Sequence, residues 1–86
     1  MADLTLVYFA WVREAIGRDE EQVARPAPDV TIGALIATLA ARGGGHGEAF
    51  ARPEKLRAAL DQRFVPLDSA IGEAKELAIF PPVTGG

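Results

Sequence analysis

Short apolar runs lie near both ends of the chain, and apolar residues recur at intervals of three and four in its middle. Residues 4–11 and 76–80 are rich in strand-forming side chains, so each run predicts a β-strand. The middle segment predicts a helix from Thr31, which can cap its first turn, to about Arg42. Its apolar stripe consists of Ile32, Leu35, Ile36 and Leu39.

Weaker patterns predict shorter elements between these three. Gly43 to Gly47 is expected to end the long helix and to form a flexible loop. Three further strands are expected at 20–24, 56–60 and 64–67, with a hairpin turn at 61–63 and helical turns at 12–17 and 48–51.

The predicted fold is of the α+β class. The two most apolar strands, 4–11 and 76–80, are expected side by side at the centre and therefore parallel, because the elements between them provide the crossover. One long helix can cover only one face of the sheet. This arrangement predicts a β-grasp (ubiquitin-like) roll, a mixed sheet of about five strands with one main helix packed on one face. The domain is expected to span 1–81, and 82–86 are expected to form a flexible tail.

The uncovered face of this sheet predicts a docking surface. Alternation turns Leu4, Leu6 and Tyr8 toward the helix. The same alternation turns Phe9, Phe64 and Phe80 away from it, as one patch near the tail. Monomers seldom expose large contiguous apolar patches, so a partner protein is the favoured explanation. The alternative is that these rings pack beneath a loop or the tail.

Composition narrows the classes of function. The chain of 86 residues is long enough for one small domain. Its net charge of −3 argues against binding to nucleic acid or to an anionic membrane. It contains no cysteine, which excludes disulfides, thiolate metal sites and a thiol nucleophile. The start of the sequence lacks the features of a signal peptide, and a cytoplasmic location is expected.

The side chains do not predict catalysis by this chain alone. His46 is the only histidine, and a solvated loop position is favoured over a catalytic base. Acidic clusters at 19–21 and 73–76 are expected to be solvated, and no metal site is predicted. Trp11 could anchor an interface or shield the end of the sheet, with the second favoured. Arg13 could pair with a partner carboxylate near the tail or be solvated, and both alternatives stay open.

The last residues carry the candidate chemistry. Gly85 and Gly86 have no side chains, so the tail could enter a narrow channel, and Pro81 and Pro82 favour an extended stem before them. The carboxylate of Gly86 is the candidate reactive group. A separate enzyme could convert it with ATP into an acyl-adenylate, open to a sulfur or nitrogen nucleophile. The alternative is a tail that ends in glycines by chance.

Both ends of the sequence resemble one family. Residues 6–14, 56–64 and, above all, 77–86 are similar to the small, sulfur-carrier subunit of molybdopterin synthase. The ending from Phe80 to Gly86, Phe-Pro-Pro-Val-Thr-Gly-Gly, carries most of the specificity. The chain departs from the family's usual residues at 59–62 and 73–76, which affects local turns and not the tail.

The resemblance implies a cycle of sulfur transfer. An E1-like adenylating enzyme would activate Gly86 with ATP, and a persulfide sulfur-donor protein would convert it to a thiocarboxylate. The large synthase subunit would then take the tail into its active site, where sulfur passes to cyclic pyranopterin monophosphate to form the molybdopterin dithiolene. Two small and two large subunits would form a heterotetramer, and this chain itself would bind no cofactor. The site residues predicted with this cycle are Gly86 and Gly85 at the reacting end, Pro81, Pro82, Val83 and Thr84 along the tail, and Phe9, Phe64 and Phe80 at the partner surface. Arg13 is a further candidate at that surface on the residue argument given above.

Three other functions stay open at this point. The chain could carry sulfur for another pathway, such as thiamine thiazole synthesis. It could be a ubiquitin-like modifier that forms isopeptide bonds with target lysines. It could also be an interaction module with an inert tail.

Overall fold

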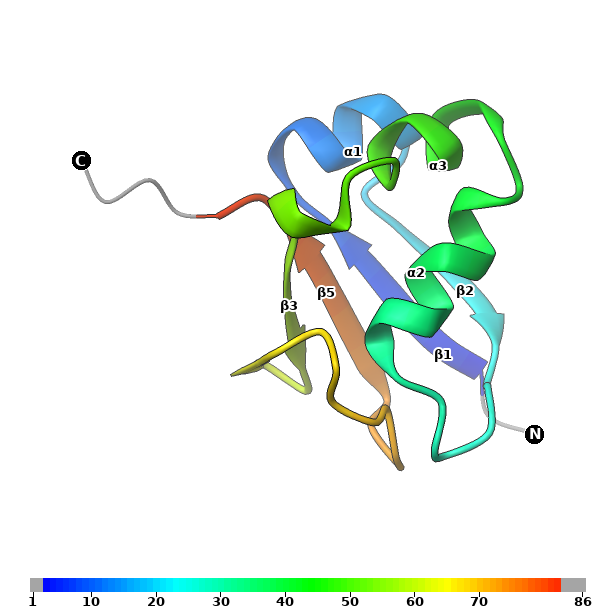
Figure 1. Cartoon of the computed structure of the whole chain (residues 1–86), viewed down its shortest axis with the longest axis vertical. Helices are drawn as coiled ribbons and strands as arrows, with labels where there is room; N and C mark the ends of the chain where they lie inside the picture. The colour runs from blue at the N-terminus through cyan, green and yellow to red at the C-terminus, as the bar shows by residue number, and fades with distance from the viewer. Residues whose placement is uncertain (1–2, 83–86) are drawn as a thin grey trace.

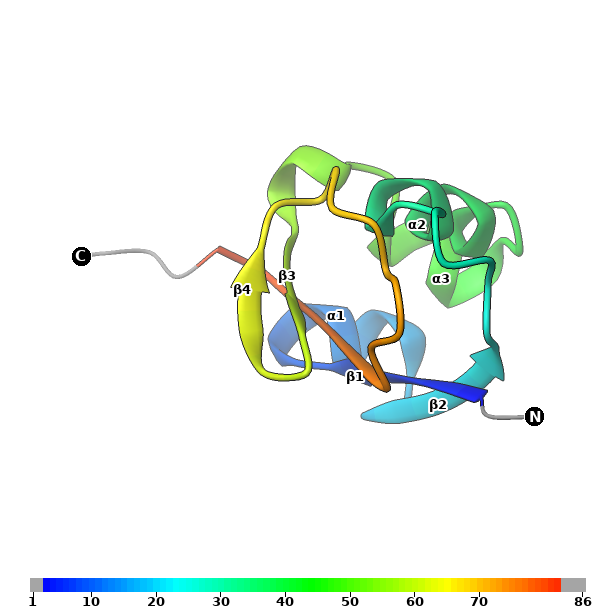
Figure 2. The same cartoon turned by 90° about the horizontal axis from the view of Figure 1, so that it is seen from below.

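Five strands form one sheet in the computed structural model, which describes residues 3–82. The helices lie over one side of that sheet (Figures 1 and 2). The strands are β1 (Asp3–Tyr8), β2 (Glu20–Ala24), β3 (Arg57–Leu60), β4 (Arg63–Val65) and β5 (Glu76–Phe80). The helices are α1 (Ala10–Ile16), α2 (Ile32–Ala40), α3 (Gly44–Ala49) and a short 3₁₀ helix, η1 (Pro53–Lys55).

The first and last of these strands lie side by side at the centre of the sheet. The strand order is β2-β1-β5-β3-β4, with β1 and β5 parallel and every other pair antiparallel. Thr5 pairs with Glu76 at one end of the parallel pair, and Tyr8 pairs with Ile79 at the other. This is the predicted β-grasp topology, and it confirms the expected fold class.

A single core fills the space between α2 and the sheet. Thr31 caps α2, because its side-chain oxygen accepts a hydrogen bond of 3.1 Å from the amide of Ala34. Each fully buried aliphatic side chain contributes about 1.5–3 kcal/mol relative to an exposed one. The largest buried side chains are Leu4, Leu6 and Tyr8 of β1, Ile32 and Ile36 of α2, Leu77 and Ile79 of β5, and Val12, Phe50 and Leu56 from other segments.

The first strand is shorter than predicted, because the chain turns after Tyr8. Phe9 is extended, but Ala10 has a φ of 54°, a left-handed conformation that L-residues rarely adopt. This turn starts α1, a longer helix than the helical turn expected at 12–17. Trp11 therefore lies on α1 and is 42% exposed, and both alternatives for its role stay predictions.

The glycine-rich segment after α2 is a helix and not the predicted loop. α3 begins at Gly44 and ends at Ala49, so the described residues contain two shorter α-helices, α1 and α3, beside the main helix α2. Gly45 lies against α1: a Cβ at this position would be 2.3 Å from the carbonyl oxygen of Ala15. Glycine is required there because the two helix backbones approach so closely.

The hairpin forms as predicted, but its turn is tighter and β4 ends earlier, at Val65. The turn consists of Asp61 and Gln62, with φ values of 48° and 71°. One side-chain oxygen of Asp61 accepts hydrogen bonds from the amides of Lys75 (2.9 Å) and Glu76 (3.0 Å). The turn is therefore fastened to the start of β5.

Within residues 3–82, no helix is long and apolar enough to cross a bilayer. The predicted division into a domain at 1–81 and a tail at 82–86 stays a prediction, because 83–86 lie outside the described residues.

Candidate functional site

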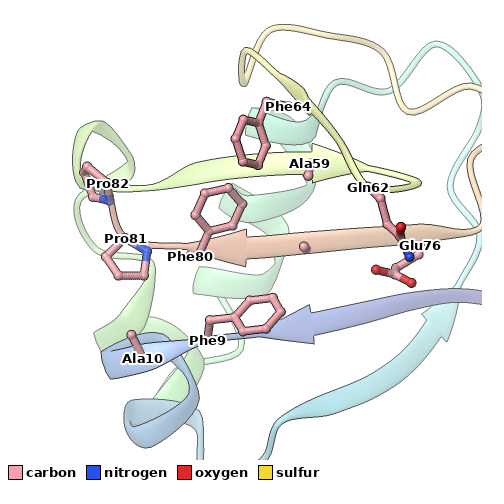
Figure 3. A pocket seen from close by; sticks show the side chains of 10 residues that line it. Phe9, Ala10, Ala59, Gln62, Phe64, Glu76, Phe80, Pro81 and Pro82 are labelled. Carbon is pink, nitrogen blue, oxygen red and sulfur yellow. The ribbon is translucent and has the colours of Figure 1, made fainter. Parts of the chain in front are cut away.

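Three aromatic rings come together on the face of the sheet opposite α2. Phe80, at the end of β5, lies between Phe9 and Phe64 (Figure 3). The ring centroids of Phe9 and Phe80 are 6.4 Å apart in an edge-to-face arrangement, and those of Phe64 and Phe80 are 5.6 Å apart. The structure therefore joins three residues that the sequence spreads over 72 positions (9 to 80). We call Phe9, Phe64 and Phe80 the aromatic patch.

Strand register explains why these rings enclose a hollow. Ala59 pairs with Phe64 on one side and with Ala78 on the other, so two small residues lie between larger ones. Both alanines are buried and form the floor of an open hollow of about 760 Å³. Gln62 and Glu76 lie at the end of the hollow away from the prolines (Figure 3).

The aromatic patch leaves large apolar side chains exposed on the sheet. Phe64 is 82% exposed and Phe9 is 47% exposed, whereas Phe80 is half-buried between them. Aromatic side chains around a shallow hollow are typical anchors of protein interfaces, because each covers a large area at little cost in conformational entropy. This arrangement favours docking of another protein on the hollow.

The hollow leads directly into the tail. Pro81 and Pro82 follow β5 and line the hollow's end, beside Ala10 of α1 (Figure 3). Arg13 is exposed on α1, and its pairing with a partner carboxylate stays a prediction. The remaining tail residues with predicted roles lie outside the described residues: Val83, Thr84, Gly85 and Gly86.

A second cluster, built around Glu21, lies on the helix side of the sheet. The hydroxyl of Tyr8 donates a hydrogen bond of 2.7 Å to Oε2 of Glu21, and Nε2 of His46 lies 2.5 Å from the same oxygen. The guanidinium groups of Arg18 and Arg42 lie 3.8 Å and 3.6 Å from Oε1. We call Tyr8, Glu21 and His46, with these two arginines, the Glu21 cluster.

The Glu21 cluster corrects two predictions. Only 7% of the Glu21 side chain and 15% of the His46 side chain are exposed, so neither residue is solvated as expected. Alternation already carried a signal for Glu21, because it shares a face of β2 with Val23, which packs against the core. No such signal existed for His46, because the segment around it was expected to be a loop.

The environment of the cluster shifts two pKa values. Burial raises the pKa of Glu21. Hydrogen bonds from His46 and Tyr8, together with the charges of His46 and Arg42, lower it by more than burial raises it, so the pKa is lowered overall. Burial, and then the hydrogen bond to Glu21, raise the pKa of Tyr8 well above its usual value. The cluster therefore holds a carboxylate and a neutral phenol.

Neither region forms a metal centre. Among residues 3–82, no three histidine, aspartate or glutamate side chains lie close enough together to hold a metal ion.

Comparison with known proteins places the chain in a sequence family. The model of the ThiS family matches residues 6–86. Two curated relatives, from Escherichia coli (strain K12) and Haemophilus influenzae, are each named molybdopterin synthase sulfur carrier subunit. Each is 39% identical to this chain over 83 residues, which cover 96% of this chain and 99% of the relative.

Solved structures with lower sequence identity share the fold. Small archaeal modifier protein 1 of Haloferax volcanii has a TM-score of 0.70 at 23% identity, covering 96% of this chain and 100% of its own. The ubiquitin of Caldiarchaeum subterraneum has a TM-score of 0.59 at 14% identity, covering 99% and 98%. These similarities show a ubiquitin-like fold and carry no argument about activity.

Proposed function

This chain belongs to the ThiS family, and from that premise we propose that it is the sulfur-carrier subunit of a molybdopterin synthase. The observation that carries the proposal is the similarity to the E. coli subunit of that name, which is 39% identical and is covered over 99% of its length. The match of the family model through residue 86 includes both the domain and the tail, the two parts that a carrier needs.

The proposed chemistry takes place at Gly86. An E1-like enzyme transfers AMP from ATP to the terminal carboxylate and releases pyrophosphate. The outer sulfur of a persulfide on the donor protein then attacks the carbonyl carbon and displaces AMP, which leaves Gly86 joined to the donor through an acyl disulfide. A thiol cleaves this S–S bond, so that the sulfur stays on Gly86 and the donor's cysteine sulfur leaves as a disulfide with the thiol. The resulting thiocarboxylate gives its sulfur to cyclic pyranopterin monophosphate, toward the molybdopterin dithiolene. The chain itself binds no cofactor. The family match through residue 86 and the absence of cysteine support a role for the terminus as the sulfur carrier.

The proposed partner of the aromatic patch is the large subunit of the synthase, in a complex of two small and two large subunits. The exposure of Phe64 supports this, because an aromatic side chain that is 82% exposed gains much by burial in an interface. The position of Pro81 and Pro82 at the end of the hollow also supports it. A partner seated on the hollow would lie next to the start of the tail.

Intact mass spectrometry tests the proposed chemistry. The chain is incubated with a cognate adenylating enzyme, ATP, a persulfide donor and a thiol reductant, and then with the large subunit and cyclic pyranopterin monophosphate. We expect one oxygen at Gly86 to be replaced by sulfur in the first step and restored in the second, with formation of molybdopterin.

One extra residue after Gly86 should abolish both steps, whereas one extra residue before Met1 should leave them intact. A variant extended after Gly86 that still delivers sulfur would contradict the proposal. Failure to form a thiocarboxylate, together with isopeptide conjugates to other proteins, would favour a ubiquitin-like modifier instead.

A further inference from the structure

α3 is a helix that its own sequence does not favour. Three of its six residues are glycine, the poorest helix former after proline. Six residues are also far fewer than an isolated helix needs in water. The described hydrogen bonds at its ends are those from the amide of Gly47 to Gly43 and from the amide of Phe50 to His46, each 3.0 Å long. The helix must therefore depend on contacts with the rest of the molecule.

Those contacts are with α1, with α2 and with the core, in which Ala49 of the helix is buried. The backbone of α3 lies against α1 at Gly45, where no side chain would fit. Phe50, just after the helix, is buried with its ring 6.2 Å from that of Tyr8. The side chain of His46 makes the polar contact between α3 and the sheet, through Glu21, and its ring lies 6.4 Å from that of Tyr8.

Glu21 gathers groups from four separate segments. Tyr8 approaches it from β1, His46 from α3, Arg18 from the residues before β2, and Arg42 from the residues between α2 and α3. All four can donate hydrogen bonds or carry positive charge, and Glu21 is the acceptor that they share. A neutral side chain at this position would lose most of that attraction, because hydrogen bonds to a charged group are the stronger ones.

We propose that α3 is a conditionally docked helix, held to the sheet by the carboxylate of Glu21, and that loss of this negative charge releases α3 while the sheet stays folded. Release would also free the end of α1 at Ala15, which touches Gly45. The start of the same helix, Ala10, lines the hollow beside the aromatic patch. The state of α3 can therefore influence the docking surface, whichever protein binds there.

Acid is one way to remove the charge. The pKa of Glu21 is lowered in the folded state, below its usual value of 4.5. The carboxylate therefore stabilises the folded protein at pH values above 4.5. That contribution is lost as the pH falls through the folded pKa. The titratable and charged groups that face Glu21 are Tyr8, His46, Arg18 and Arg42, as described above.

Amide hydrogen exchange of the full chain, followed by NMR, tests the proposal. The amides of Gly47 and Phe50 report on α3, and the amide of Thr5, which bonds to Lys75 between β1 and β5, reports on the sheet. In the wild type we expect the α3 amides to open separately from the sheet and at least about tenfold more often. Glu21→Gln should raise their opening by about a further tenfold or more, with Thr5 still more protected than they are.

The matched control is Glu20→Gln, which neutralises the neighbouring exposed carboxylate and should leave α3 unchanged. The wild type, followed from about pH 7 to about pH 3, gives the same information without a substitution, once the intrinsic pH dependence of exchange is removed. If the amides of Gly47 and Phe50 exchange only when the amide of Thr5 does, α3 does not open separately from the sheet, and the proposal is overturned. Unchanged α3 exchange in Glu21→Gln would overturn it as well.

Discussion

Gln62 has a backbone conformation that favours glycine. Its φ of 71° lies in the left-handed region, at the second position of the two-residue hairpin turn. Gln62→Gly should therefore raise the free energy of unfolding by about 0.5–1 kcal/mol, measured by denaturant unfolding. The same change at Gln22, in the middle of β2, should lower it by about 0.5–1 kcal/mol. A loss of stability in Gln62→Gly would show that the side chain contributes more than the backbone strain costs.

Phe64 is the residue of the aromatic patch best suited to a test of docking, because it is 82% exposed and can change without disturbing the core. Phe64→Asp should weaken binding to the large synthase subunit by about 2 kcal/mol or more, roughly 30-fold in Kd, because it places an unpaired charge in an apolar interface. Titration calorimetry measures this. Gln22→Asp, on the same face of the sheet but two strands from Phe80, should bind as the wild type does. Equal affinities for both variants would exclude the patch as the docking surface.

The aromatic patch was predictable from the sequence, and the Glu21 cluster was not. Alternation along a strand fixes the face of each side chain, so Phe64 and Phe80 could be placed together once their strands were assigned. Glu21 attracts His46 across 25 positions, and no local pattern encodes that pairing. The predicted roles of the residues after Pro82 stay predictions.

Packing between α1 and α3 decides which glycines the helices need. Gly45→Ala should lower the free energy of unfolding by about 1–3 kcal/mol, because its Cβ would overlap the carbonyl oxygen of Ala15. Gly33→Ala in α2 is the matched control: its Cβ would lie 3.5 Å from the carbonyl oxygen of Leu67, an ordinary contact. That variant should be as stable as the wild type or more stable by up to about 1 kcal/mol. Thermal unfolding of both variants measures these differences. A Gly45→Ala variant as stable as the wild type would contradict the close packing of α3 against α1.

Two helices differ from their prediction for reasons that local sequence does not contain. α1 starts where Ala10 adopts a positive φ, and an alanine in the sequence does not predict such a conformation. α3 forms in a glycine-rich segment because tertiary contacts override its low propensity. α2 was predicted well, since its cap at Thr31 and its apolar stripe are both local features.

The topology of the whole molecule followed from the positions of its most apolar segments. Strands that are apolar throughout are favoured at inner positions of a sheet. β1 and β5 both occupy such positions, and β3 is the third inner strand. β1 and β5 pair in parallel, as predicted. The long segment between them provides the crossover connection that a parallel pair needs. The positions of α1 and α3 around that frame depended on side-chain contacts that only the structure provides.

The pH dependence of global stability should reflect Glu21. Its folded pKa lies below the unfolded value of 4.5, so the wild type should lose stability as the pH falls below about 4.5. Glu21→Gln should be less stable than the wild type near neutral pH, and the two should converge in acid. Urea unfolding across this range measures both curves, with Glu20→Gln expected to follow the wild type. A constant difference between Glu21→Gln and the wild type at every pH would mean that the charge of Glu21 does not stabilise the fold.

The parallel pairing of β1 with β5 also determines how the domain bears mechanical load. Asp3 begins β1 at one end of the sheet, and Phe80 ends β5 at the other (Figure 1). A pull between these two points runs along both strands, so it loads their ladder in shear, with all hydrogen bonds strained together rather than opened one by one. Forced unfolding is governed by the height of that barrier and not by the equilibrium stability. A protein that pulls the tail while the start of β1 is held would therefore load the whole β1–β5 ladder at once.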